Sequence, residues 1–456
     1  MNTILLQPTD VLFFRDGRPI GGASAGHGAA WPLPSVINHA LHAALHRAGG
    51  VFDQAHPHRR GRSGIYTADA DRRFGSLVTA GPFPVCVKDV SQTWFFPRPA
   101  DADDTCAVFL HPNRTDAPSS LPAPCKYPVV SSKPPTKERP KPWWSESAWS
   151  AYLGRKEGAP VLRADTDFAD TEHNYGIGLN PDTGTVQEGQ FYSASYLRLR
   201  DEWRLGVIAA APDKDYRHAE HGNDLIRSLL NGHGREIIVG GQQRVCTATL
   251  EHLSTGLPLP LGLGEAKQLT RPGGGFRVKW VLLSPAVWPE VPAGLSKRGT
   301  TRKFHPGGWL PNWICPSSGD ILLETIAPEE RRRRRSLNYG GKGYESKPAR
   351  NARLVAALVP KPLAVTGWAL ANDTDRSEGG AKATHFAVPA GAVYYFEADS
   401  EDAAVTLANA LNWHGSDTNP TTIRNRRSTL LGEKGFGLGV CGTWDFLQDV
   451  RGRPKS

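Results

Sequence analysis

The pattern of apolar and polar positions predicts strands and helices in alternation from the start of the chain. An apolar run over residues 3–6 predicts a strand, and residues 11–14 predict a second strand after a Pro-Thr-Asp break. Over residues 36–48 apolar side chains recur at helical spacing; Ser35 can cap this segment and Gly49 can end it. The opening order is therefore strand, strand, helix.

Further elements follow in the rest of the first half. Residues 190–199 alternate like a strand, and residues 203–211 are expected to be its hairpin partner. A short helix is predicted at 224–230. The loop Gly-Gly-Gln-Gln-Arg at 240–244 then leads into a strand at 245–250.

The second half repeats this order of elements. Strands are predicted at 276–283 and 393–397, and Ser400 caps a helix expected to run through Trp413. A glycine-rich loop at 432–439 then enters a final strand at 440–446. Two βαββαβ-like units fit this order, so we expect an α+β fold with two ferredoxin-like, or RRM-like, domains over residues 1–255 and 256–456.

Two segments interrupt the predicted units. Residues 97–142 hold eleven prolines and few apolar clusters. We therefore expect a surface insertion or linker there, outside the core, as part of an irregular insertion at about 97–165. A basic insertion is expected at about 328–353 in the second domain.

Charge gives the first indication of a partner. The chain has 54 Lys and Arg against 45 Asp and Glu, a net charge of +9. Residues 331–353 alone contain nine basic side chains and one acidic one. Such a block favours an anionic partner, although a solvated loop that aids solubility is the alternative. Cations and aromatic rings that suit single-stranded RNA alternate in this block, namely Arg331, Arg333, Arg335, Tyr339, Lys342 and Tyr344.

The glycine-rich loops are the next candidates for RNA contact. In the terminal loop, Lys434 precedes glycines that would let backbone N–H groups approach a phosphate; the candidate residues are Lys434, Gly435, Phe436, Gly437 and Gly439. The loop is neither a P-loop nor a dinucleotide fingerprint, because it lacks Gly-Lys-Ser/Thr and lies between a helix and a strand. A tight structural turn is the alternative. Arg244, beside two glycines, holds the equivalent place in the first half.

Candidate catalytic chemistry is sparse. His27 lies in a glycine loop where it could act as a general acid or base in RNA cleavage, but it has no recognisable partner. His42 and His46 are four residues apart without the glutamate of a zinc protease, so a solvent-facing helix surface is the better interpretation. We therefore expect no metal site and no cofactor.

Cysteine spacing and hydropathy indicate the cellular compartment in which the protein works. Six cysteines lie far apart with no Cys-x-x-Cys pair, which argues against a disulfide framework and a zinc ribbon. The chain lacks an apolar run of 18 residues and a recognisable signal peptide at its start. These features predict a cytoplasmic protein that does not engage a membrane.

The string Phe-Arg-Asp-Gly-Arg-Pro at 14–19 resembles the start of the third subunit of the Cmr complex, a RAMP-superfamily protein of type III-B CRISPR effectors. Segments at 176–199, 240–244, 389–397 and 432–439 resemble the same family in the same order. The resemblance implies two ferredoxin-like RAMP domains. It also implies a non-catalytic scaffold that holds the repeat-derived 5′ tag of the CRISPR RNA and docks the large polymerase-like subunit. Other RAMP subunits would be neighbours, and target RNA would be met indirectly.

Arg15 and Arg18 lie within the string that carries this resemblance. Arg15 and Asp16 cannot both face an apolar core unpaired. Either they pair with one another or with neighbours and shape the loop, or Arg15 and Arg18 contact RNA phosphates while Asp16 orients them, and we favour the second. Two rival functions stay open: a metal-independent endoribonuclease that processes CRISPR RNA with His27 as acid or base, and a protein adaptor whose basic block meets an acidic subunit.

Overall fold

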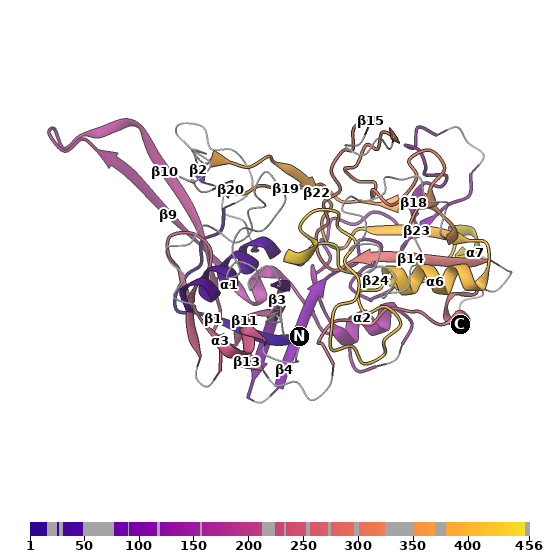
Figure 1. The fold of residues 1–456 in the computed structure, drawn as a ribbon, viewed down its shortest axis with the longest axis horizontal. Coiled ribbons are helices and arrows are strands. Elements are labelled where there is room, and N and C mark those ends of the chain that lie inside the picture. Colours follow the sequence, from indigo (N-terminus) through magenta and orange to yellow (C-terminus); the bar gives the residue numbers. More distant parts are fainter. Residues whose placement is uncertain are drawn as a thin grey trace.

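Two antiparallel sheets, one in each half of the chain, lie side by side with helices packed against them (Figure 1). The fold is mixed α+β, as the sequence predicts. The computed structural model describes residues 1–15, 25–26, 31–48, 77–89, 91–115, 119–155, 157–211, 224–231, 234–251, 256–271, 275–295, 301–323, 350–369 and 380–451.

The N-terminal sheet has eight strands in the order β12-β13-β1-β11-β3-β4-β7-β8. Their bounds are β1 Asn2–Pro8, β3 Val78–Lys88, β4 Ser91–Pro97, β7 Trp143–Ser145, β8 Leu162–Arg163, β11 Trp203–Ala210, β12 Arg235–Ile238 and β13 Val245–Glu251. The central strand β1 pairs with β11 and β13. Its Ile4 and Leu6 enter one core while Leu5 enters another, so both faces are buried. A continuous apolar run suits such a strand.

Helices α1 (Pro34–Ala48) and α3 (Leu225–Leu229) pack against this sheet. In α1, Ile37, Leu41 and Leu45 are buried at intervals of four residues, which is the apolar stripe expected from the sequence. Asp224 caps α3 by accepting a hydrogen bond from the Ile226 backbone amide. Both predicted helices are present, but α1 begins at Pro34, so Ser35 lies inside the helix and does not cap it.

A long hairpin of β9 (Ala169–Leu179) and β10 (Val186–Leu199) projects from the N-terminal half (Figure 1). The prediction that β10 pairs with residues 203–211 is wrong. That segment is β11, whose apolar side chains place it inside the main sheet between β1 and β3, so β10 pairs with β9 and β2 (Ala25–Gly26). Residues 11–14 form no strand either, since only Leu12 bridges to Leu197.

The C-terminal sheet has the order β17-β18-β23-β14-β24. The strands are β14 Phe276–Leu282, β17 Asp320–Ile321, β18 Arg350–Leu358, β23 Val393–Ala398 and β24 Gly439–Gly442. Helix α6 (Glu401–Leu411) packs on this sheet and is capped by Ser400. It ends at Leu411 rather than Trp413. The Asn412 side chain instead donates a hydrogen bond to the Leu263 carbonyl and accepts one from the Cys441 backbone amide. The last strand stops at Gly442 instead of 446.

The two sheets share an order of strands. In the first, β1 is followed by α1, β3, β11, α3 and β13, and the sheet order is β13-β1-β11-β3. In the second, β14, β18, β23, α6 and β24 give the sheet order β24-β14-β23-β18. Among the described residues no helix lies between β14 and β18, where the first unit has α1 between β1 and β3.

The proline-rich segment belongs partly to the core, so the expectation of a surface linker is wrong. Asp101 is fully buried and accepts hydrogen bonds from Lys279 (2.9 Å) and Tyr152 (2.7 Å). A buried lysine on β14 needs a counter-ion, and this segment supplies it. Ala102 and Cys106 pack in the same core cluster as both sheets. The halves thus form one packed body.

Short elements complete the described chain. They are β5 Leu110–Pro112, β6 Val129–Ser131, α2 Glu146–Tyr152, a 3₁₀ helix η3 Asp165–Asp167, α4 Ala266–Leu269, β15 Gly294–Leu295, β16 Thr301–Arg302, β19 Leu363–Val365, β20 Trp368–Ala369, β21 Gly380–Ala381, β22 His385–Ala387, η4 Gly432–Lys434 and α7 Leu447–Arg451. Within the described ranges, no helix is long and apolar enough to cross a membrane.

Candidate RNA interface

The structure places the predicted RNA-binding residues in two regions, the base of the β9–β10 hairpin and the terminal glycine-rich loop. Arg15 and Arg244 lie in the first region, and Lys434 and the three loop glycines with Phe436 lie in the second. The remaining candidates fall outside the described residues; they are Arg18, His27, Arg331, Arg333, Arg335, Tyr339, Lys342 and Tyr344.

The loop at 240–244 packs tightly on the segment that carries Arg15. The Gly241 amide donates to the Phe13 carbonyl at 2.9 Å. Gly240 has a left-handed φ of +81°, and a Cβ there would stand 2.5 Å from the same carbonyl oxygen. Only glycine permits this approach. The close contact brings Arg244 and the exposed Arg15 to the same end of the N-terminal sheet.

Arg244 is partly committed to neighbours within the protein. Its guanidinium lies 5.1 Å from the centre of the Tyr196 ring, and its Nη1 lies 3.4 Å from an Asp10 carboxylate oxygen. Arg198 also pairs with Asp10, at 2.9 Å. Arg198 also pairs with Glu172, so two carboxylates balance the two arginines at the hairpin base.

Two residues of this loop were missed by the sequence analysis as candidates. Gln242 and Gln243 both adopt left-handed backbone conformations, with φ of 56° and 55°. Such conformations are costly for residues other than glycine and cluster at functional sites. Tyr196 donates its hydroxyl hydrogen to Gln242 Oε1 at 2.7 Å, which holds the turn against β10. The signal in the sequence was the pair of amides directly after two glycines.

The terminal glycine-rich loop does not form an open phosphate cradle. Its backbone amides from 434 to 438 already donate to protein acceptors, which are the oxygens of Leu431, Gly432, Pro285 and Ser284. Phe436 is fully buried in a cluster with Val287, Val365 and Ala387, so its ring cannot stack on a base. The expectation that Phe436 and these amides bind RNA is therefore corrected.

The same loop joins the two halves. A Cβ on Gly435 would stand 3.0 Å from the Thr79 carbonyl oxygen of β3 and 3.4 Å from Pro34 at the start of α1. A Cβ on Gly439 would stand 2.3 Å from Trp280 Nε1. The glycines allow close packing rather than ligand access. We call the loop 432–439, with the β3 and α1 residues it touches, the joint.

Lys434 is half-buried and retains access to solvent. Its ammonium group donates a hydrogen bond to His39 Nε2 on α1 at 2.8 Å. Burial lowers the pKa of Lys434, nearby Glu433 raises it and Lys382 lowers it further. A half-buried lysine beside a second lysine is favourably placed to receive an anion.

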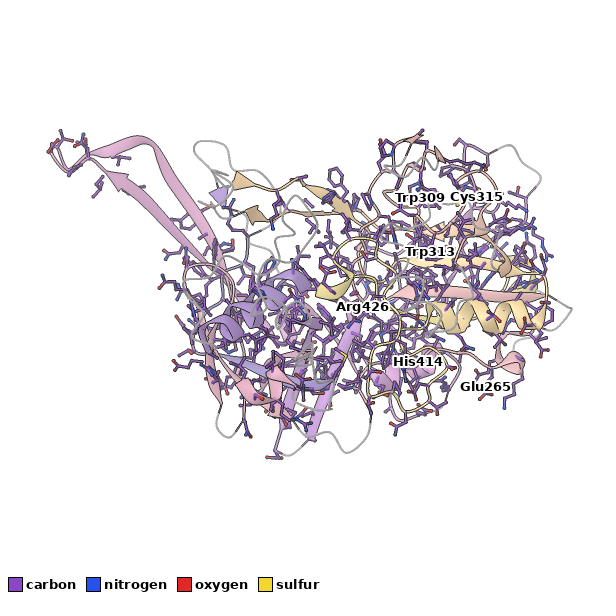
Figure 2. The ribbon with its side chains drawn as sticks, viewed as in Figure 1. Glu265, Trp309, Trp313, Cys315, His414 and Arg426 are labelled. Atoms are coloured by element: carbon purple, nitrogen blue, oxygen red, sulfur yellow. The ribbon has the colours of Figure 1, made fainter. Side chains whose placement is uncertain are left out.

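Arg426, beside the joint, was missed by the sequence analysis. Its Nε and Nη2 are buried and have no hydrogen-bond partner within the described part of the chain. Burial lowers its pKa to about 10, and Glu433 opposes that shift. Figure 2 shows Arg426 near the middle of the molecule, between the two halves. Buried donors without an acceptor are costly, so these two nitrogens are candidates for contact with an anion.

The neighbours of Arg426 in sequence have structural roles. Arg427 donates from Nε to the Ala410 carbonyl at 2.7 Å, and Arg424 lies 3.8 Å from Asp417 on the surface. The signal in the sequence was Arg-Asn-Arg-Arg at 424–427, just before the glycine-rich loop. Sequence alone could not tell which arginine lacks a partner, because the partners come from distant segments.

Two buried histidines, His414 and His305, serve packing. His414 accepts a hydrogen bond from the Gly262 amide at 3.0 Å, and burial lowers its pKa to about 4. His305 bonds to backbone groups of its own loop. Within the described residues, no group of three or more His, Cys, Asp or Glu side chains could hold a metal ion.

Comparison with known proteins supplies the family. A family model described as CRISPR-associated protein (Cas_Cmr3) matches residues 4–444. No curated protein sequence matches this chain.

Two solved structures are distantly similar. A chain in the cryo-EM structure of type III-B Cmr-beta bound to cognate target RNA is 13% identical, with a TM-score of 0.36, over 86% of each chain. A chain in the crystal structure of the Csm3–Csm4 subcomplex of the type III-A CRISPR-Cas interference complex is 9% identical, with a TM-score of 0.31, over 88% of this chain and 95% of that one. Because the family model spans nearly the whole sequence, this chain belongs to the Cas_Cmr3 family of CRISPR-associated proteins, as its resemblance to the third Cmr subunit indicates.

Proposed function

We propose that this chain is a non-catalytic RNA-binding scaffold of a type III-B Cmr effector complex. In this role it holds the repeat-derived 5′ tag of the CRISPR RNA and docks the large polymerase-like subunit. The observation that carries the RNA-binding part is Arg426, a half-buried arginine next to the joint whose Nε and Nη2 have no hydrogen-bond partner among the described residues. Membership of the Cas_Cmr3 family supports the assembly.

The fold supports a pair of ferredoxin-like RAMP domains. A ferredoxin-like unit has the element order βαββαβ. The first sheet has this element order, and its four strands lie in the order β13-β1-β11-β3. The second has the same order of strands. We place the domain boundary near residue 255, with the proline-rich and basic insertions within the first and second domains.

Two cationic regions would hold the RNA backbone. Arg15 and Arg244 lie at the hairpin base, and Arg426 and Lys434 lie at the joint. The basic block at 331–353, with its alternating tyrosines, would add phosphate neutralisation and base stacking. Arg18 and His27 follow Arg15 in the chain and would extend the first region.

The partners and compartment follow from the same proposal. The chain would sit among other RAMP subunits in the cytoplasm and meet target RNA through the CRISPR RNA rather than directly. Cleavage would belong to neighbouring subunits. The endoribonuclease alternative, with His27 as acid or base, predicts discrete cleavage of precursor RNA in chelator, and the adaptor alternative predicts no salt-dependent RNA affinity.

A binding titration tests the proposal. The purified chain is titrated with a short RNA that carries the repeat-derived 5′ tag, and with the same RNA lacking it, at several salt concentrations. We expect tighter binding of the tagged RNA and a linear fall of log affinity with log salt. Equal affinity for both RNAs, or affinity that does not depend on salt, would refute tag holding by this subunit.

A further inference from the structure

A narrow ribbon of short strands is packed on the joint. We call residues 361–369 and 380–387 the ribbon; it contains the strand pairs β19–β22 and β20–β21. Figure 1 shows it extending from the C-terminal half towards the N-terminal half. Val365 and Ala387 of the ribbon are buried in one cluster with Phe436 of the joint. One face of the ribbon is therefore fixed against the joint.

The other face of the ribbon presents an aromatic ring to solvent. Phe386 is 66% exposed, whereas its neighbour Ala387 is fully buried. Successive residues of a strand point to opposite faces, so Phe386 lies on the side away from the buried cluster. Its cross-strand partner is Ala364, a side chain too small to cover the ring. A single exposed apolar residue is ordinary, so the surroundings of Phe386 decide whether it has a role.

These surroundings are cationic. The described ribbon contains two exposed lysines, Lys361 and Lys382, and no aspartate or glutamate. Lys382 lies close enough to Lys434 of the joint to lower its pKa. Arg426 lies next to the same loop, with two buried nitrogens that find no partner among the described residues. An aromatic ring among cations is typical of proteins that bind single-stranded RNA, because cations meet the phosphates and rings stack on the bases.

A protein partner would need a wider apolar surface than the ribbon offers. Interfaces between proteins are built on contiguous apolar patches. Leu363, the other large apolar side chain exposed on the described ribbon, is the cross-strand partner of Ala387 and so lies on the opposite face from Phe386. Glu433 is the acidic residue of the joint loop, and the cations outnumber it. One ring beside a surplus of positive charge fits an unpaired base better than a protein surface.

We propose that Phe386 stacks on an unpaired base of the RNA whose backbone is held at the joint. The ligand is single-stranded RNA, since a base inside a duplex already has both faces covered. Every base has a π face, so this contact adds affinity for a single strand without choosing a sequence. The inference rests on the proposed function and adds to it a contact that involves no charge.

Removal of the ring separates stacking from charge. Phe386→Ala should weaken binding of the full chain to tagged single-stranded RNA at least about fivefold at fixed salt. The salt slope should stay that of the parent chain because no cation is lost, and Phe386→Trp should retain the parent affinity. The matched control is Leu363→Ala, which removes exposed apolar atoms from the same ribbon and should leave RNA affinity unchanged. Thermal unfolding of both alanine variants should match the parent chain.

A fluorescent base locates the contact. The tag carries the adenine analogue aminopurine at one position at a time, and stacking on a ring quenches its fluorescence. We expect one position to be quenched by the parent chain and by Phe386→Trp, and to regain fluorescence with Phe386→Ala.

Two results would overturn this inference alone: parent RNA affinity in Phe386→Ala, or quenching that persists without the ring. If Phe386→Ala keeps its RNA affinity but loses association with purified subunits of the complex, the ring meets protein instead. A parent chain that binds no RNA would overturn the proposed function together with this inference.

Discussion

Arg426 is the side chain on which the proposed RNA binding depends most. Its flanking residues are fixed by hydrogen bonds: Asn425 donates to the Asn409 and Asn412 carbonyls, and Arg427 to that of Ala410. Among the residues that the structure describes, Arg426 Nε and Nη2 are buried and find no hydrogen-bond partner. A phosphate oxygen bound there would form charge-assisted hydrogen bonds, which are among the stronger contacts in proteins.

Replacing this side chain should separate binding from stability. We expect Arg426→Gln to weaken affinity for tagged RNA about five- to tenfold and to reduce the salt slope by about 0.7, the value for one phosphate contact on a single strand. Because the variant removes two buried donors that have no acceptor among the described residues, its thermal stability should stay equal or rise. The measurement is RNA titration at several salt concentrations, beside thermal unfolding.

The matched control is Arg424→Gln, two residues away and exposed on the surface. This variant removes the same formal charge but no buried donor. Its affinity for tagged RNA should therefore stay within about twofold of that of the parent chain. If both variants bind RNA alike, Arg426 has no specific role. If Arg426→Gln unfolds the chain, the Arg426 side chain has a structural role.

His414 gives a residue-scale prediction about pH. Burial lowers the pKa of His414 to about 4 in the folded chain, against 6.5 for an ordinary histidine. Between these values the unfolded chain binds more protons, so the free energy of unfolding falls as pH drops from 6.5 towards 4. Protonation of His414 alone should lower the free energy of unfolding by about 3 kcal/mol between pH 6.5 and pH 4.

Denaturant unfolding at pH 7 and at pH 5 measures this effect. His414→Gln keeps an acceptor for the Gly262 amide but cannot be protonated, so the variant should lose less stability on acidification than the parent chain. Identical losses in both proteins would show that His414 is protonated in the folded state as easily as in the unfolded one.

At the scale of elements, the glycine-rich loop acts as a joint. Gly437 has a left-handed φ of +76°, and a Cβ there would stand 2.1 Å from the Ser428 backbone nitrogen. We expect Gly437→Ala to lower the free energy of unfolding by more than the roughly 1–3 kcal/mol of a strained backbone, because a backbone clash is added. Denaturant unfolding checks the size of the effect.

Gly184 at the tip of the β9–β10 hairpin is the matched control. It has a left-handed φ of +66°, but a Cβ there would meet no atom within 4 Å. Gly184→Ala should therefore lower the free energy of unfolding only by the energy of the strained backbone. Equal losses for both alanines would contradict the packed joint and favour an open loop at 432–439.

Elements defined by local pattern could be predicted from the sequence, and pairings between distant elements could not. Helices α1 and α6 were predictable because their apolar spacing, and for α6 the Ser400 cap, lie within one segment. The partner of β10 could not be predicted. Strand β11 follows β10 most closely in sequence, but it pairs with β1 and β3 because its apolar faces are buried in the main sheet. Burial of Phe436 depends on distant residues, because its cluster includes Val287 and Leu33, the latter from the first half of the chain.

At the scale of the whole molecule, the two halves share one apolar core. Leu5 and Phe83 of the first sheet belong to the same cluster as Trp280 and Tyr394 of the second. The buried Lys279–Asp101 pair ties the proline-rich segment into it. A rigid connection of this kind suits a scaffold, because the cationic regions at the hairpin base and the joint keep fixed positions for a bound RNA.

We propose that this chain holds CRISPR RNA inside an effector assembly. The most direct measurement is to purify the tagged protein from its native host and to sequence the RNA that accompanies it. We predict short RNAs that share one repeat-derived 5′ end, together with other RAMP subunits. Protein that purifies without RNA and without partners would contradict the scaffold role.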